Sequence, residues 1–163
     1  MHVFSKDEFE GQGLVVEIIS LLLFVGIIYF GIKGALVLSL QTTSPMMGVS
    51  GDSMTQVDGS WKDYYIEGGF EPSAFPFQNG LHDGDLVIVR GVQSIEEVDI
   101  GDVIIWRRGG GEAIVHRVAV INREEGYIRT RSDRYGGLDR RVWIEDILGE
   151  AVYSIPYLGR LTF

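Results

Sequence analysis

The sequence contains no cysteine and very little lysine. Without cysteine there can be no disulfide framework, no thiolate zinc site and no cysteine nucleophile. The only lysines are Lys6, Lys33 and Lys62, so any general base in the last hundred residues must be another side chain.

Positive charge is also scarce relative to negative charge. The chain carries 14 Lys and Arg against 23 Asp and Glu, a formal net charge of −9. Nucleic-acid binding needs a basic surface that neutralises phosphates, and no basic stripe is present. The composition therefore excludes a nucleic-acid partner, and it disfavours acidic lipid head groups for the same reason.

One long apolar block is present near the N-terminus, at residues 14–40. Its only charged residues are Glu17 and Lys33, and residues 18–32 are uncharged throughout. At about 1.5 Å per residue, a helix over this block is roughly 40 Å long, enough to cross a hydrocarbon core of about 30 Å. We predict a transmembrane anchor over residues 14–40, preceded by a tail at residues 1–13.

A cleaved signal peptide is the alternative interpretation of the same block. Signal peptides begin with a basic region and end in a small-residue cleavage site. The residues before the block include three acids, and no Ala-x-Ala pattern follows Leu40. These features favour an anchor, but the sparse lysines leave its orientation undecided.

The remainder, residues 41–163, has room for one domain, and its patterning is mainly β. Short runs rich in Val, Ile and aromatics are bounded by turn residues, which predicts strands at 86–89, 103–106, 113–121 and 127–131. Residues 55–80 are rich in Gly, Ser, Pro and aromatics, and we predict a long ordered loop there.

Two residues could provide hydrolytic chemistry in this domain. Ser53 becomes a nucleophile only if a base removes its proton. His116 lies within a strand-like run, whereas His2 is at the terminus, His82 is in a polar turn and Lys62 lies in the loop after the serine. His116 is therefore the preferred base, although an isolated serine or strand histidine is more often structural.

Several motifs in order resemble type I signal peptidases of the archaeal and endoplasmic-reticulum branch. The similar segments are SGDSM at 50–54, GDLV at 84–87, GDVI at 101–104, IVHRV at 114–118 and TRSD at 130–133, followed by Asp139. Four features depart from the family pattern: Thr55 follows the serine motif where a proline is common, a long insertion occupies 55–80, Gly51 replaces a common serine, and Ser132 replaces a glycine.

The resemblance implies a signal-peptidase-like β-fold with one N-terminal transmembrane helix. It also implies a membrane-bound serine endopeptidase that removes signal peptides, with Ser53 as nucleophile, His116 as base and no metal or cofactor. Asp139 or Asp133 orients the histidine, with Asp139 preferred. The implied partners are secretory preproteins, membrane lipid and the translocation machinery, and the implied location is the cell membrane with an extracytoplasmic domain.

Two other interpretations remain open. Self-cleaving repressor-type peptidases are related, but they resemble Ser-Lys catalysts and need no membrane span. A membrane-tethered binding module without chemistry would instead use the aromatic residues between Trp61 and Phe77 to contact its partner.

Overall fold

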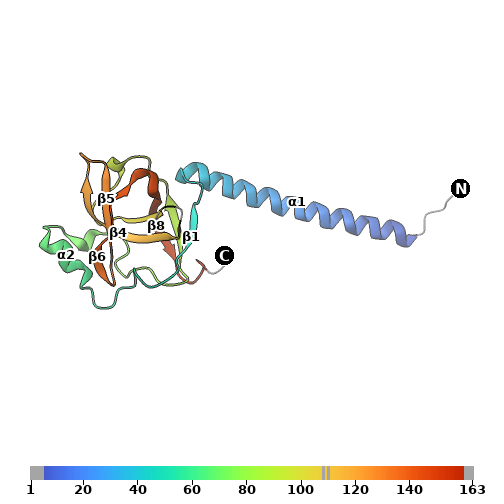
Figure 1. Ribbon diagram of the computed structural model, residues 1–163. Helices are drawn as coiled ribbons and strands as arrows, with labels where there is room; N and C mark the ends of the chain where they lie inside the picture. The colour runs from blue at the N-terminus through green and yellow to red at the C-terminus, as the bar shows by residue number, and fades with distance from the viewer. Residues whose placement is uncertain (1–5, 108, 110, 160–163) are drawn as a thin grey trace. The chain divides into compact units, whose positions relative to one another are not determined.

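The chain divides into two compact units, Met1–Ser39 and Leu40–Phe163. The computed structural model describes residues 6–107, 109 and 111–159, with side chains from residue 13 onward. The first unit is almost entirely helix and the second is built on an antiparallel sheet (Figure 1).

The helix α1 runs over Lys6–Leu40. Its portion Gly13–Leu40 is long and apolar enough to cross a membrane, and its apolar side chains are exposed within the structure. The helix starts earlier than the predicted boundary at residue 14, because the polar residues before Gly13 contain no proline and can continue helical hydrogen bonding.

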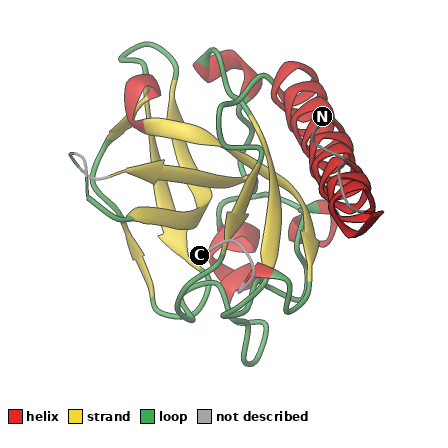
Figure 2. Ribbon diagram, turned by 90° about the vertical axis from the view of Figure 1, so that its right-hand side faces the viewer, coloured by secondary structure: helices red, strands yellow, loops and turns green. Residues whose placement is uncertain are grey.

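The second unit is an antiparallel sheet, whose strands are yellow in Figure 2. It has eight strands in the order β1-β2-β8-β3-β4-β5-β6, with β7 paired to β5. Its strands are β1 Met46–Gly48, β2 Leu86–Arg90, β3 Val103–Arg107, β4 Ala113–Asn122, β5 Tyr127–Ser132, β6 Gly136–Leu138, β7 Val142–Trp143 and β8 Ile147–Ile155. Short 3-10 turns occupy Pro72–Ala74, Ile95–Glu97 and Ile144–Asp146. The mainly β prediction for this unit is confirmed.

Strand β3 lies near the centre of the sheet, and its side chains are buried on both faces. Val103 and Ile105 belong to one apolar cluster, while Ile104 and Trp106 belong to another. Successive side chains of a strand point to opposite faces, so a continuous apolar run is expected where both faces are covered. The sequence of β3 is such a run.

Strand β4 changes its pairing halfway along. It pairs with β3 through residues 113–117 and with β5 through residues 117–122, with an irregularity between Val118 and Val120. The edge of β4 on the β5 side is consequently unpaired over Ala113 to His116 among the described residues. Strand β1 likewise pairs only with β2, which leaves its second edge open.

The segment 55–80 contains a helix that the predicted ordered loop did not include. Helix α2 spans Trp61–Glu67, and its buried residues Trp61 and Tyr65 are four apart, which places them on one helical face. Phe75 packs against both rings, and a bridge between Thr55 and Gly80 joins the two ends of the segment. The assignment of the whole segment as loop was wrong, because residues 61–67 form a helix.

Candidate active site

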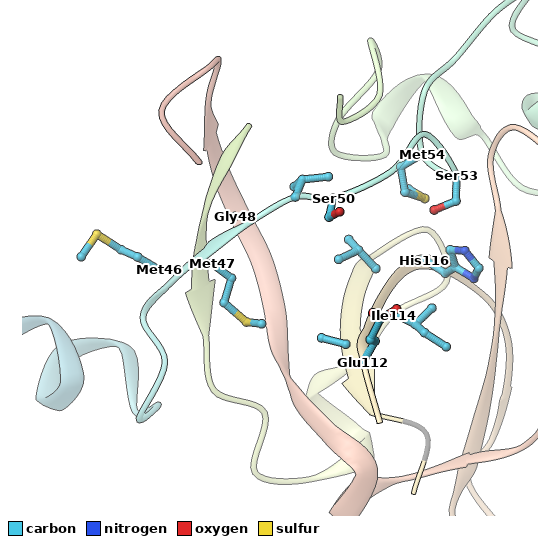
Figure 3. Close-up of a pocket in the computed structure, with 12 residues that line it drawn as sticks. Met46, Met47, Gly48, Ser50, Ser53, Met54, Glu112, Ile114 and His116 are labelled. Carbon is cyan, nitrogen blue, oxygen red and sulfur yellow. The ribbon is translucent and has the colours of Figure 1, made fainter. Parts of the chain in front are cut away.

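A cavity of about 670 Å³ opens between the two free strand edges. One wall comes from β1 and the chain after it, and the other comes from the start of β4. Ser53 and His116 both line this cavity, and Figure 3 draws them on the same side of it. Met47, Met54 and Ile114 make much of the remaining lining apolar.

The segment carrying Ser53 is fixed by a turn that follows β5. The backbone oxygen of Ser53 accepts hydrogen bonds from the Ser132 hydroxyl at 2.6 Å and from the Arg134 amide at 3.0 Å. Asp52 accepts a hydrogen bond from Tyr135 at 2.7 Å and forms an ion pair with Arg134 at 2.7 Å. These contacts tie the serine segment to residues about eighty positions later in the sequence.

Met54, the residue after Ser53, holds the same segment in place by packing into the apolar core. Its side chain is 2% exposed and packs in the apolar cluster that also contains Leu81 and Val103. Its backbone oxygen accepts a hydrogen bond from the Leu81 amide. An apolar residue at this position therefore holds the neighbouring hydroxyl at the cavity wall.

His116 contacts the carboxylate of Asp139. The distance from His116 Nδ1 to Asp139 Oδ2 is 2.6 Å, and both side chains are mostly buried, with exposed fractions of 14% and 24%. The chain turns at residues 133–135 between β5 and β6, and Gly136 and Gly137 at the start of β6 are both at positive φ. Strand β6 returns the chain so that the Asp139 amide donates to the Thr130 carbonyl. Asp139 is thus the carboxylate that contacts the His116 ring.

Asp133, the second predicted partner, lies against Arg117 instead. The Arg117 guanidinium donates hydrogen bonds to both carboxylate oxygens of Asp133, at 2.8 to 3.3 Å, and the two side chains are almost completely buried. Arg117 also donates to three backbone carbonyls and lies 4.2 Å from the centre of the Trp61 ring. Asp133 also accepts a hydrogen bond from Gln56, so it joins the 55–80 segment to the sheet.

The Ser53 hydroxyl and the His116 ring share the cavity without a hydrogen bond between them in the described part of the chain. Hydrogen bonds between a nucleophile and its base are often loose without substrate and tighten when substrate binds. The other candidate bases are elsewhere. Lys62 sits over the Trp61 ring and His82 is half exposed beside Asp85, and neither lines the cavity, while His2 is outside the described residues.

Gly51 has a backbone conformation that explains the departure from serine. Its φ of +91° lies in the left-handed region that favours glycine, and its amide donates to the Asp83 carboxylate. Ser50 lines the cavity, and among the described residues no hydrogen bond occupies the Ser53 amide. Both groups are therefore available as donors near the serine hydroxyl.

Sequence reasoning missed the part of this site that lies behind His116. The Thr130 hydroxyl donates to Asp139 Oδ2 at 2.6 Å and accepts a hydrogen bond from the Trp106 ring at 3.0 Å. Thr130 lies on the buried face of β5 together with Ile128 and Ser132. A polar residue at a buried position of a strand needs a partner, and this was the signal available.

Comparison of the chain with protein-family models and with curated proteins finds no match. In the described residues, no group of three His, Asp or Glu side chains is placed to hold a metal ion.

Proposed function

We propose that this protein is a membrane-bound serine endopeptidase that removes signal peptides from translocated preproteins, in the manner of type I signal peptidases. The observation that carries the proposal is the position of three side chains. Ser53 and His116 line one cavity. Asp139 contacts Nδ1 of His116, which leaves Nε2 to accept the proton of Ser53.

The chemistry follows from this arrangement. Ser53 Oγ attacks the scissile carbonyl carbon while its proton passes to Nε2 of His116, which gives a tetrahedral oxyanion. Collapse of the oxyanion breaks the C–N bond, and the imidazolium returns the proton to the departing amine. Water, deprotonated by the same imidazole, then hydrolyses the acyl-enzyme and restores the serine. Asp139 holds the Nδ1–H tautomer and stabilises the imidazolium.

The oxyanion requires donors near Ser53 Oγ. The Ser53 amide and the Ser50 hydroxyl are the groups we assign to this task, since both lie at the cavity and Gly51 has no side chain to offer.

The two free strand edges support an extended substrate. Strand β1 and the first half of β4 both present unpaired backbone groups beside the cavity. A peptide in extended conformation can hydrogen-bond to such edges and place alternate side chains in apolar pockets. The Met47 and Ile114 side chains supply apolar surface for small substrate residues.

Chain connectivity supports a location at the membrane. Residues 41–45 connect α1 to β1, and this connection spans at most about 18 Å when fully extended. The domain thus follows a helix able to span the bilayer by a short connection. We place it on the extracytoplasmic side, where translocated preproteins expose their cleavage points beside the translocation machinery.

Cleavage of a signal-sequence precursor in membranes tests the proposal. We expect the wild-type chain to cleave the precursor at one position. Ser53→Ala and His116→Ala should each lower the rate by several orders of magnitude, as removal of a member of a catalytic triad does.

Matched controls are available on the same chain. Ser73 is exposed and His82 is half exposed, and neither lines the cavity, so Ser73→Ala and His82→Ala should retain full activity. Full activity in His116→Ala would refute the assignment of the base.

Most of the bulk of the aromatic segment gives little support to a binding module, although Phe70 is 44% exposed. Trp61 and Tyr65 are 2% and 1% exposed and pack against Phe75 and Arg117. These rings stabilise the domain and are not presented to a partner.

A further inference from the structure

A line of hydrogen bonds extends from the interior of the sheet to His116. It begins at the Trp106 ring on β3, passes through the Thr130 hydroxyl on β5 and ends at the carboxylate oxygen that contacts His116. Trp106 and Thr130 are 1% and 0% exposed, so the hydrogen bond between them is shielded from solvent.

The direction of each hydrogen bond is fixed by chemistry. The Trp106 ring nitrogen carries a hydrogen and can only donate, so Thr130 Oγ1 must accept from it. The single hydroxyl hydrogen of Thr130 is then left for Asp139, which as a carboxylate can only accept. Asp139 Oδ2 therefore receives the Thr130 hydroxyl and the Nδ1–H of His116 together.

We propose that Thr130 is a positioning residue for the catalytic histidine, and that Trp106 sets the direction of its hydroxyl. Thr130 touches neither substrate nor Ser53, and it acts by fixing the rotation of the Asp139 carboxylate. A carboxylate that is fixed in this way holds the imidazole of His116 in one tautomer and one orientation. This inference rests on the proposed peptidase function for its kinetic consequence, but not for its structural one.

The main variant is Thr130→Val, which keeps the shape of the side chain and removes the hydroxyl. We expect kcat for precursor cleavage to fall about tenfold or more, the change that corresponds to one hydrogen bond lost in the transition state. KM should stay within about twofold, because Thr130 is not among the residues that line the cavity. Thr130→Ser restores the hydroxyl and should restore most of kcat.

A proton NMR measurement in detergent micelles tests the same inference without any activity. The Nδ1–H of His116 should give a low-field, slowly exchanging signal in the wild type and in Thr130→Ser. The signal should broaden or disappear in Thr130→Val, because the carboxylate then loses the hydrogen bond from the Thr130 hydroxyl that fixes its rotation. Trp106→Phe should weaken the signal by releasing the Thr130 hydroxyl, and this gives a second route to the same result.

Thr42→Val is the matched control, since it removes another buried threonine hydroxyl, one that accepts from the Ser44 amide away from the cavity. It should leave both the signal and kcat unchanged. An unchanged His116 signal in Thr130→Val would overturn the inference, as would equal losses of kcat in Thr130→Val and Thr130→Ser. If wild type shows the signal but no cleavage, the proposed function fails while the positioning role of Thr130 stands.

Discussion

The two aspartates near His116 have separate tasks. Asp139 contacts the imidazole and the Thr130 hydroxyl, whereas Asp133 compensates the charge of the fully buried Arg117. An unpaired charge in the interior is costly, so the Asp133 pair is expected to matter for stability. The Asp139 contact is expected to matter for chemistry, because it selects the tautomer of the base.

Replacement of Asp139 by asparagine should separate these tasks. An amide at this position can donate to Nδ1 and so favours the wrong tautomer of His116. We expect kcat to fall on the order of 10⁴-fold, with little change in the urea midpoint. Precursor cleavage and urea unfolding followed by tryptophan fluorescence measure the two quantities.

Replacement of Asp133 by asparagine should have the opposite pattern. The buried Arg117 would lose its counter-charge, and we expect the free energy of unfolding to fall by about 3 to 5 kcal/mol. Arg123→Gln is the control, because its ion pair with Glu96 is exposed and should contribute less than about 1 kcal/mol. Similar unfolding midpoints for the two variants would contradict the structural role of Asp133.

Asp102 makes stability depend on pH. Burial, reinforced by the carboxylates of Glu150 and Asp99, raises the pKa of Asp102 to about 6. A pKa raised by folding means that the neutral form is favoured in the folded state. The associated stability is complete below the unfolded pKa, near 4, and is lost as the pH rises through about 6.

Asp102→Asn should therefore unfold at a higher urea concentration than the wild type at pH 8, and at nearly the same concentration at pH 4. Asparagine keeps an oxygen for the hydrogen bond from the Asp99 amide. Measurements of the urea midpoint at several pH values test the sign. A variant that is less stable than the wild type at pH 8 would contradict it.

At the scale of elements, the 55–80 segment packs against the residues that support the candidate site. Trp61 lies against the buried Arg117 and packs on Phe75, and Gln56 donates a hydrogen bond to the Asp133 carboxylate. Asp133 lies between Ser132 and Arg134, which hold the Ser53 carbonyl. The insertion thus stabilises the turn that fixes the serine segment.

Trp61→Ala should lower the free energy of unfolding by about 3 to 5 kcal/mol, the usual cost of removing a large buried ring. Ile66→Ala lies on the same helix at an exposed position and should change stability by less than about 0.5 kcal/mol. Chemical unfolding of both variants measures these losses, and a small loss in Trp61→Ala would show that the segment packs only loosely on the domain.

Local pattern predicted much of the fold but not all of it. The predicted strands at 86–89, 103–106, 113–121 and 127–131 were confirmed within one residue at each end as β2 to β5. Strand β8 was missed, although it lies between β2 and β3. Its irregular pairing and the exposed residues Val152 and Tyr153 weaken the alternation that signals a strand.

The residues of the candidate site could be predicted from motifs, but the contacts between distant segments that support it could not. Ser53, His116 and Asp139 follow from recognisable segments, and the structure brings His116 and Asp139 into contact. Other contacts depend on pairing between strands that are distant in sequence. They include the hydrogen bond from Ser132 to the Ser53 carbonyl and the one from Trp106 to Thr130. Such pairings leave no local periodicity, so sequence reasoning could not rank Asp139 above Asp133 with certainty.

At the scale of the whole molecule, a helix able to span a bilayer precedes a compact antiparallel β domain. The domain has its own apolar clusters, two of which cover opposite faces of β3. The site lies within the second unit, so its chemistry needs no residue of the anchor. In the proposed function, helix α1 anchors the peptidase and restricts it to substrates at a membrane surface.

Covalent labelling of the full chain by a serine-directed fluorophosphonate, with mass-spectrometric mapping of the label, tests the central claim most directly. The account predicts that Ser53 is labelled in the wild type and that His116→Ala slows this labelling by at least about 100-fold, because the hydroxyl then has no base. Absence of label on Ser53, or equal labelling rates in wild type and His116→Ala, would contradict it.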